Sequence, residues 1–217
     1  IAPGDGHRRE AVALDARDPY TRQHSYRVAE MSEALATACG WSRASIDMIH
    51  LAGHVHDIGK IGIPDAILWK SGALEDHEFL LIEQHVTIGD DILSQVDSLV
   101  ELTPWVRGHH ERFDGRGYPD GLKGSNIPEG ARLIAVPDSF DAMLSHRPYR
   151  RGMSLDRTLD ELVAHRGSQF DPEILDSFLV IAEELHEILY TALLQPAHQP
   201  RAVDHNAVRH SIARQSM

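Results

Sequence analysis

Apolar residues recur every three or four positions along most of this chain, which is the period of an amphipathic helix. The first such run follows Asp18-Pro19, a typical helix start, stops at Gly40, and carries its apolar side chains at Val28, Met31, Leu35 and Ala38. Convincing alternation of apolar and polar residues, the sign of a strand, is missing from the sequence. The pattern therefore predicts an all-α fold.

Glycine, proline and capping residues divide the remaining helical stretches. We expect Ser42 to cap a helix that runs to His56-Asp57, and later helices to open at Pro128, Ser154 and Asp171-Pro172, the last continuing through Leu189. Shorter helical stretches are predicted over residues 65–69, 75–84, 87–96 and 100–110. Residues 114–130 are rich in glycine and proline and predict a long loop, which in a compact domain is usually functional or disordered.

Composition bounds the class of protein. The 217 residues are 42% hydrophobic and 25% charged, which suits one soluble helical domain over residues 1–195, with a core of about 15–180 and a polar tail over 196–217. The net charge of −12 argues against nucleic-acid polymers and anionic membrane surfaces as partners. A single cysteine and no apolar run of membrane length favour the cytoplasm. Because the chain begins at Ile1, we also expect an N-terminal regulatory domain upstream.

The candidate chemistry lies among the 15 histidines. His56-Asp57 is followed by Lys60, so one helical turn would present an imidazole, a carboxylate and an ammonium to one site, provided that the helix continues that far. Such a pair is weak evidence in isolation. It gains weight from His24, His85, the adjacent pair His109-His110, and Asp138, which stands in an apolar run where an unpaired charge is costly. His50 and His54 lie off that face, and we expect them to be packing or surface residues.

Five imidazoles and two carboxylates are too many for one tetrahedral zinc site. Shared between two ions, with Asp57 as the bridge, they give each ion about four protein ligands. Nitrogen and oxygen ligands without thiolate favour iron or manganese, with zinc or magnesium as alternatives. Two such ions form the usual clamp for in-line attack on a phosphate.

Five motifs stand in order along residues 15–180: Asp18-Pro-Tyr-Thr-Arg-Gln-His-Ser25, His56-Asp-Ile-Gly-Lys-Ile-Gly-Ile-Pro64, His109-His-Glu-Arg-Phe-Asp-Gly-Arg-Gly-Tyr-Pro119, Ile127-Pro128 with Ala131-Arg132, and Asp138-Ser-Phe-Asp-Ala142 continuing to Arg147-Pro-Tyr-Arg150. In these motifs the chain resembles HD-GYP domains, the bacterial cyclic-di-GMP phosphodiesterases of the HD superfamily. The resemblance implies a compact helical bundle with a binuclear metal centre beside the glycine-rich loop.

By position, the resemblance assigns one ion to His24, His56, Asp57 and Asp138, and the other to Asp57, His85, His109 and His110. Some members bind a third ion through a glutamate one turn before the first histidine. Tyr20 occupies that place here, so we expect two ions. Pro137 stands before the metal aspartate where the family favours a small residue, and it could kink that helix.

The resemblance also implies roles around the metals. Lys60 would lie beside the scissile phosphate, and Asp141 would orient Lys60 or a ligand. Arg147 and Arg150 match a basic pair that grips the substrate's phosphate or guanine. Tyr118 belongs to the Gly-Tyr-Pro loop, and the resemblance implies that it helps to bind the substrate. By the same resemblance the loop would shape the site and contact partners such as GGDEF-type diguanylate cyclases.

The expected function is hydrolysis of cyclic-di-GMP to pGpG, GMP or both, by attack of a hydroxide that bridges the two metals. Lys60 and Asp57 would take part directly, together with Asp141. Two alternatives stay open: a phosphodiesterase for another cyclic dinucleotide or nucleotide, and a non-catalytic module that senses cyclic-di-GMP or docks a partner. A homodimer is compatible with either.

Overall fold

The computed structural model describes residues 23–70, 72–145 and 151–191, and these ranges are helical with no β-strand among them. The predicted all-α class is confirmed. The helix start at Asp18-Pro19 and the polar tail at 196–217 lie outside the described residues. Within the described ranges, no helix has both the length and the apolar character needed to cross a membrane.

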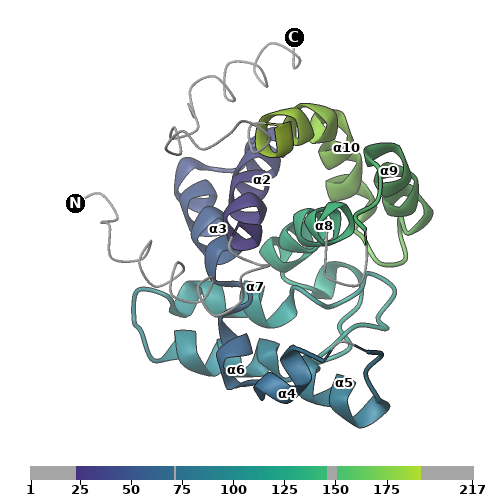
Figure 1. The fold of residues 1–217 in the computed structure, drawn as a ribbon. Coiled ribbons are helices and arrows are strands. Elements are labelled where there is room, and N and C mark those ends of the chain that lie inside the picture. The colour runs from purple at the N-terminus through teal and green to yellow at the C-terminus, as the bar shows by residue number, and fades with distance from the viewer. Residues whose placement is uncertain (1–22, 71, 146–150, 192–217) are drawn as a thin grey trace, which may run out of the picture.

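The first two helices form a closely packed pair, α2 (His24–Ala38) and α3 (Arg43–Val55), which lie side by side in Figure 1. Ser42 caps α3 as predicted, because its hydroxyl oxygen accepts the backbone N–H of Ser45. Gly53 allows the close approach: a Cβ at this position would lie 2.7 Å from Cα of Ala29 on α2. This contact brings the end of α3 beside the start of α2.

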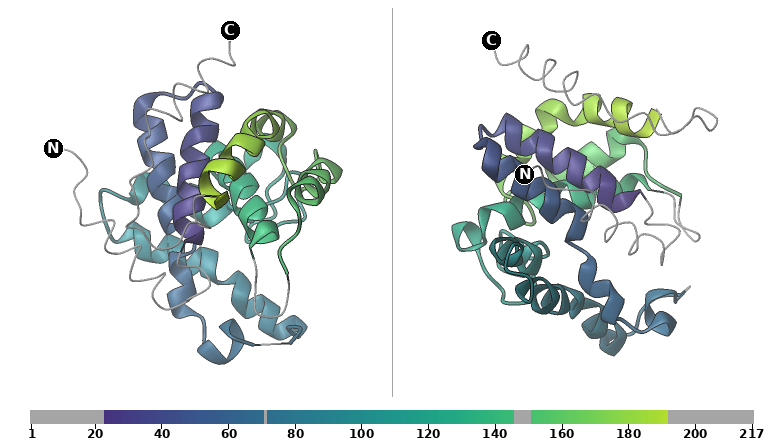
Figure 2. Two further views of the ribbon diagram at one scale, coloured as in Figure 1. Left: turned by 45° about the horizontal axis from the view of Figure 1, so that its top comes forward. Right: turned by 90° about the vertical axis from the view of Figure 1, so that its left-hand side faces the viewer.

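The α-helix does not continue to His56-Asp57 as predicted. It ends at Val55, and a tighter 3₁₀ turn, η1 (Ile58–Gly62), follows. Three helices come next, α4 (Asp65–Leu68), α5 (Asp76–Glu83) and α6 (His85–Ser94), and they lie together at one end of the molecule (Figures 1 and 2). Gly59 packs directly against α6, where a Cβ would lie only 1.8 Å from the carbonyl oxygen of His85.

The chain then returns to the centre of the molecule. A 3₁₀ turn η2 (Val100–Leu102) leads into α7 (Thr103–Gly108), and the predicted loop over 114–130 follows, interrupted by η3 (Gly124–Asn126). Helix α8 (Glu129–Leu144) is central in Figure 1 and contacts α2, α7, α9 and α10. Pro137 lies inside α8 without ending it.

Two further helices close the bundle, α9 (Leu155–Ala164) and α10 (Pro172–His186). Ser154 and Asp171 cap them through their side chains, as predicted. The last helix was expected to run as an α-helix through Leu189, but it turns into a π-helix, η4 (Glu187–Thr191), after His186. The hydrophobic core fills the space between α2, α3, α8 and α10, and its largest buried side chains include Met31, Ile49, Phe140 and Phe178.

Candidate metal centre

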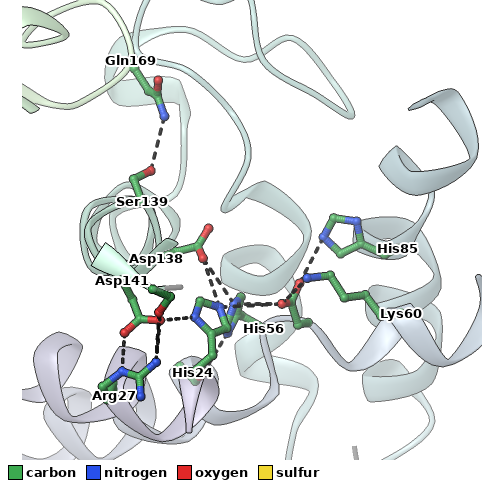
Figure 3. Close-up of polar contacts among 12 residues, drawn as sticks. His24, Arg27, His56, Lys60, His85, Asp138, Ser139, Asp141 and Gln169 are labelled. Carbon is green, nitrogen blue, oxygen red and sulfur yellow. Dashed lines mark hydrogen bonds and ion pairs between the residues drawn. The ribbon is translucent and has the colours of Figure 1, made fainter. Parts of the chain in front are cut away.

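Seven histidine and aspartate side chains from five parts of the chain meet between α2, α3, α6, α7 and α8, in the region of Figure 3. In each of two groups, the candidate ligand atoms lie within 4.8 Å of one another. One group is Asp57, His85, His109 and His110; the other is His24, His56 and Asp138. We refer to these seven residues as the His/Asp cluster. The structure brings together every residue that the sequence pattern marked as a candidate ligand.

Element boundaries position most of these side chains. His24 is the first residue of α2, and His85 is the first residue of α6. The pair His56-Asp57 fills the junction between α3 and η1, and His109 is the C-terminal cap of α7. Only Asp138 comes from the middle of a helix, α8. The close backbone contacts at Gly53 and Gly59 hold α3 and η1 against their neighbours, and so they help to position the cluster residues at these junctions.

Asp57 lies between the two groups and faces both. Its Oδ2 is 3.4 Å from Nε2 of His56 and 3.8 Å from Nε2 of His24. Its Oδ1 is 3.5 Å from Nε2 of His85, in the other group. The two oxygens of one carboxylate thus point toward different sets of imidazoles, which is the arrangement that a bridging ligand requires.

Three histidines of the cluster each make the same kind of contact with the backbone, to the carbonyl group three residues earlier. Nδ1 of His56 lies 2.8 Å from the carbonyl oxygen of Gly53. In the same way, Nδ1 of His85 lies 2.7 Å from the carbonyl oxygen of Ile82, and Nδ1 of His109 lies 2.6 Å from that of Val106. A carbonyl oxygen can only accept, so Nδ1 carries the hydrogen in each ring. The other ring nitrogen, Nε2, is the atom directed into the cluster, where it can offer a lone pair to a metal ion.

These inward atoms fit a metal site. Nε2 of His56, His85 and His109 and Oδ1 of Asp57 are buried and have no hydrogen-bond partner among the described residues. Buried polar atoms in proteins are nearly always partnered, so four of them together indicate a ligand. Imidazole nitrogens with carboxylate oxygens and no thiolate suit iron, manganese or zinc. The cluster can therefore hold metal.

The electrostatics of the cluster differ between its two groups. Burial lowers the pKa of His85 and of His109, and it lowers the pKa of His110 to about 4. Burial also lowers the pKa of His24, but hydrogen bonds to Asp138 and Asp141 outweigh it and raise that pKa to about 10. Burial would raise the pKa of Asp57, yet Lys60 and the neighbouring imidazoles hold it well below its usual range.

Lys60 reaches the cluster from η1 rather than from a continuous α-helix. Its Nζ donates to Oδ2 of Asp57 at 2.5 Å, three residues away. The side chain remains 31% exposed, whereas that of Asp57 is 6% exposed. Lys60 therefore lies at the boundary between the buried aspartate and the solvent, where a bound anion would also arrive.

Asp141 is fully buried. Of its two predicted roles, orienting Lys60 or orienting a metal ligand, its contacts do not fit the first. It does not contact Lys60. Nδ1 of His24 donates to its Oδ2 at 2.7 Å, Arg27 donates to both of its oxygens, and Tyr190 donates to Oδ1. Asp141 is thus the residue that orients His24, which was the other half of the prediction. Sequence reasoning missed Arg27 and Tyr190, although Arg27 stands one helical turn after His24 and so shares its face.

The glycine-rich loop contacts the cluster through Tyr118, whose ring lies 5.0 Å from that of His110 at an interplanar angle of 33°. Glu111, which the sequence analysis did not single out, anchors the loop. It is buried, and its carboxylate accepts the backbone N–H groups of Asp120 at 2.7 Å and Leu122 at 3.0 Å. Glu111, which directly follows the two cluster histidines, therefore holds the loop in place.

The remaining candidates lie elsewhere. His50 and His54 contact each other at 3.1 Å, and His50 also pairs with Glu33, so these two histidines stay outside the cluster as predicted. Arg147, Arg150 and Tyr20 lie outside the described residues.

The chain is similar to proteins of known families. Residues 10–174 match the HD domain family. A Thermotoga maritima protein named cyclic di-GMP phosphodiesterase is 42% identical over 174 residues, which are 79% of this chain and 47% of that protein. A Vibrio cholerae protein named 3′3′-cGAMP-specific phosphodiesterase 1 is 36% identical over 180 residues, covering 82% of this chain and 42% of its own length.

The fold agrees as well. A crystal structure of a cyclic GMP-AMP specific phosphodiesterase from V. cholerae superposes with a TM-score of 0.65 at 16% identity, covering 95% of this chain and 57% of that one. The chain belongs to the HD domain family. The resemblance to HD-GYP domains that the motifs indicated is confirmed. The chain spans about half the length of the relatives that it matches.

Proposed function

We propose that this chain is a metal-dependent phosphodiesterase that hydrolyses cyclic-di-GMP to pGpG, GMP or both. The observation that carries the proposal is the position of Asp57, with one carboxylate oxygen toward His24 and His56 and the other toward His85. Two adjacent sets of donor atoms that share a carboxylate are the usual construction of a binuclear phosphodiesterase centre. The names of the T. maritima and V. cholerae relatives support a cyclic dinucleotide as the substrate class.

In this proposal two divalent ions occupy the cluster. His24, His56 and Asp138 would hold one, His85, His109 and His110 would hold the other, and Asp57 would contribute to both. Iron or manganese suits this donor set better than softer metals, with zinc or magnesium as alternatives. When bound, the ions supply Lewis acidity and activate water for attack on the phosphorus.

The side chains of this protein account for the rest of the reaction. A water molecule gives up one proton to the solvent and its oxygen bonds to phosphorus, the bond from phosphorus to the 3′ oxygen breaks, and the leaving oxygen takes up a proton. Lys60 is the group that we assign to supply that proton, because its ammonium stands at the partly exposed edge of the cluster. The same charge offsets the negative charge that builds on the phosphate oxygens. Asp141 fixes the ring of His24 through its Nδ1.

We also assign a role to the Gly-Tyr-Pro loop and keep one alternative substrate. The outer surface of the Gly-Tyr-Pro loop is the place that we assign to a partner such as a GGDEF-type diguanylate cyclase. The relative named for cyclic GMP-AMP keeps that dinucleotide as the second candidate substrate. A purely sensory module is disfavoured because all seven cluster residues are present.

The test is hydrolysis after anaerobic loading with Fe(II) or Mn(II). Cyclic-di-GMP, cyclic GMP-AMP and cyclic-di-AMP are supplied in parallel, the products are separated chromatographically, and the metal content is measured on the same sample. We expect about two ions per chain and conversion of cyclic-di-GMP. Asp57→Ala should lose both, whereas Asp91→Ala, at an exposed aspartate of α6, should keep both. Full activity in Asp57→Ala would overturn the proposal, and a metal-loaded wild type that only binds the nucleotide would favour the sensory alternative.

A further inference from the structure

A cavity of about 260 Å³ adjoins the His/Asp cluster and is lined on that side by His109, His110 and Asp138. Pockets that bury a whole drug-sized ligand usually measure roughly 300–1,000 Å³. This cavity is therefore suited to one part of a dinucleotide rather than to all of it. If a phosphate lies at the cluster, the part that enters the cavity is an attached base.

One wall of the cavity comes from α5, which contributes Phe79 and Glu83. These residues are four positions apart and so share a face of the helix. Phe79 leaves 49% of its surface exposed, so its ring is accessible to a ligand in the cavity. Glu83 is half-buried and forms no hydrogen bond or ion pair with another described side chain. Together they offer an aromatic face and a carboxylate with free lone pairs.

Other parts of the lining come from the Gly-Tyr-Pro loop and α8. Arg112 is held there by Asp114 and by Gln169, whose amide in turn donates to Ser139, the neighbour of Asp138 in Figure 3. Arg116 also lines the cavity, but it is exposed and its guanidinium takes part in none of the ion pairs found between described residues. The lining of the cavity therefore includes one uncommitted hydrogen-bond donor, Arg116, and one uncommitted acceptor, Glu83.

This pairing matches guanine and not adenine. Guanine carries two adjacent donors, N1–H and the 2-amino group, on one edge, and two acceptors, O6 and N7, on the other. A carboxylate can only accept and a guanidinium can only donate. Adenine would turn its N1 acceptor toward the carboxylate, so that contact would be lost. Its 6-amino donor would face the guanidinium where guanine offers O6, which leaves N7 as the one acceptor for Arg116.

We propose that this cavity is a guanine subsite, in which Phe79 stacks on the base, Glu83 accepts its N1–H and 2-amino hydrogens, and Arg116 donates to O6 and N7. The assignment rests on the proposed phosphodiesterase function. It makes α5 and the loop the elements that determine which cyclic dinucleotide is cut, while the cluster performs the hydrolysis.

The test compares cyclic-di-GMP, which carries guanine bases, with bis(p-nitrophenyl) phosphate, which carries no nucleobase. For Glu83→Gln, we expect KM for cyclic-di-GMP to rise about 10- to 100-fold with little change in kcat, because a hydrogen bond to a charged group is lost. Phe79→Ala should raise KM about tenfold through lost stacking. Hydrolysis of bis(p-nitrophenyl) phosphate, which needs only the cluster, should remain within about twofold in both variants. Leu80→Ala, at the neighbouring exposed apolar residue outside the cavity, and Glu101→Gln, at an exposed glutamate, are the matched controls.

The two proposals fail in different ways. If the wild type cuts cyclic-di-GMP and both variants keep its KM, the guanine subsite is refuted and the proposed function stands. If the wild type cuts only bis(p-nitrophenyl) phosphate, the proposed substrate is wrong, and inhibition of that reaction by GMP and AMP then tests the subsite. Stronger inhibition by GMP that disappears in Glu83→Gln supports the guanine subsite, and equal inhibition by the two nucleotides overturns it.

Discussion

Nδ1 of His24 donates to Oδ2 of Asp141 at 2.7 Å, and Arg27 is bound to the same carboxylate from the next turn of α2. Asp141 thus holds a candidate metal ligand and a buried arginine with one charge. Asp141→Asn removes that charge while keeping the shape of the side chain. Because an uncompensated buried arginine remains, the free energy of unfolding should fall by about 3–5 kcal/mol, measured by urea denaturation.

The same variant should lose metal selectively. Removing the group that orients a ligand typically weakens metal binding about 10- to 100-fold, so the content should fall from about two ions to about one per chain. Ser145→Ala removes a 3.1 Å hydrogen bond to the same carboxylate and a 3.2 Å hydrogen bond from Arg27, but it leaves the charge of Asp141 in place and should retain both ions. If Asp141→Asn binds two ions as tightly as the wild type, Asp141 does not support the ligand set.

The contact between η1 and α6 gives a second prediction. Gly59→Ala would place a methyl group 1.8 Å from the carbonyl oxygen of His85, so one of the two segments must move. We expect destabilisation of about 1–3 kcal/mol and a marked loss of activity, although no candidate ligand is changed. Gly72→Ala meets nothing within 4 Å and should leave the unfolding free energy within about 0.5 kcal/mol of the wild type. Thermal unfolding and turnover of the two variants, measured side by side, check this.

Removing the metal should lower the thermal stability. A ligand present at about one hundred times its Kd adds about 2.7 kcal/mol to the stability of a folded protein. For a chain of 217 residues this corresponds to about 5–10 °C in Tm. Treatment with a chelator should reveal this difference in the wild type, and added Mn(II) should reverse it. In Asp57→Ala the chelator should have little effect, and an equal shift in both proteins would argue against binding at the cluster.

Glu111 gives a prediction about the loop. Glu111→Gln keeps one carbonyl oxygen but loses the charge that accepts two backbone N–H groups, so we expect a loss of about 1–3 kcal/mol in stability. Hydrogen exchange at the amides of Asp120 and Leu122 should become faster in this variant. Glu101→Gln, at an exposed position, should leave both amides as protected as in the wild type. Unchanged protection in Glu111→Gln would show that other contacts hold the loop.

The sequence was sufficient to predict the all-α class and the seven residues that meet in the cluster. Both depend on regularities that a sequence displays: the helical period, and ligand types at recognisable positions. The side chains that it did not reveal depend on tertiary docking. Arg27 and Asp141 are 114 residues apart, and Tyr190 and Asp141 are 49 apart, so no local pattern connects them. The 3₁₀ turn at η1 was also missed, because it follows from the packing of Gly59 on α6 rather than from periodicity.

Helix α5 contributes two side chains to the wall of the cavity and none to the His/Asp cluster. A substitution at Phe79 or Glu83 therefore changes the surroundings of a ligand without touching a candidate chelating atom. Under the proposed function, selection acting on this helix would change the preferred nucleotide while the seven residues of the His/Asp cluster are inherited intact. In evolutionary terms, new substrate preferences would then arise through a few changes on one short helix.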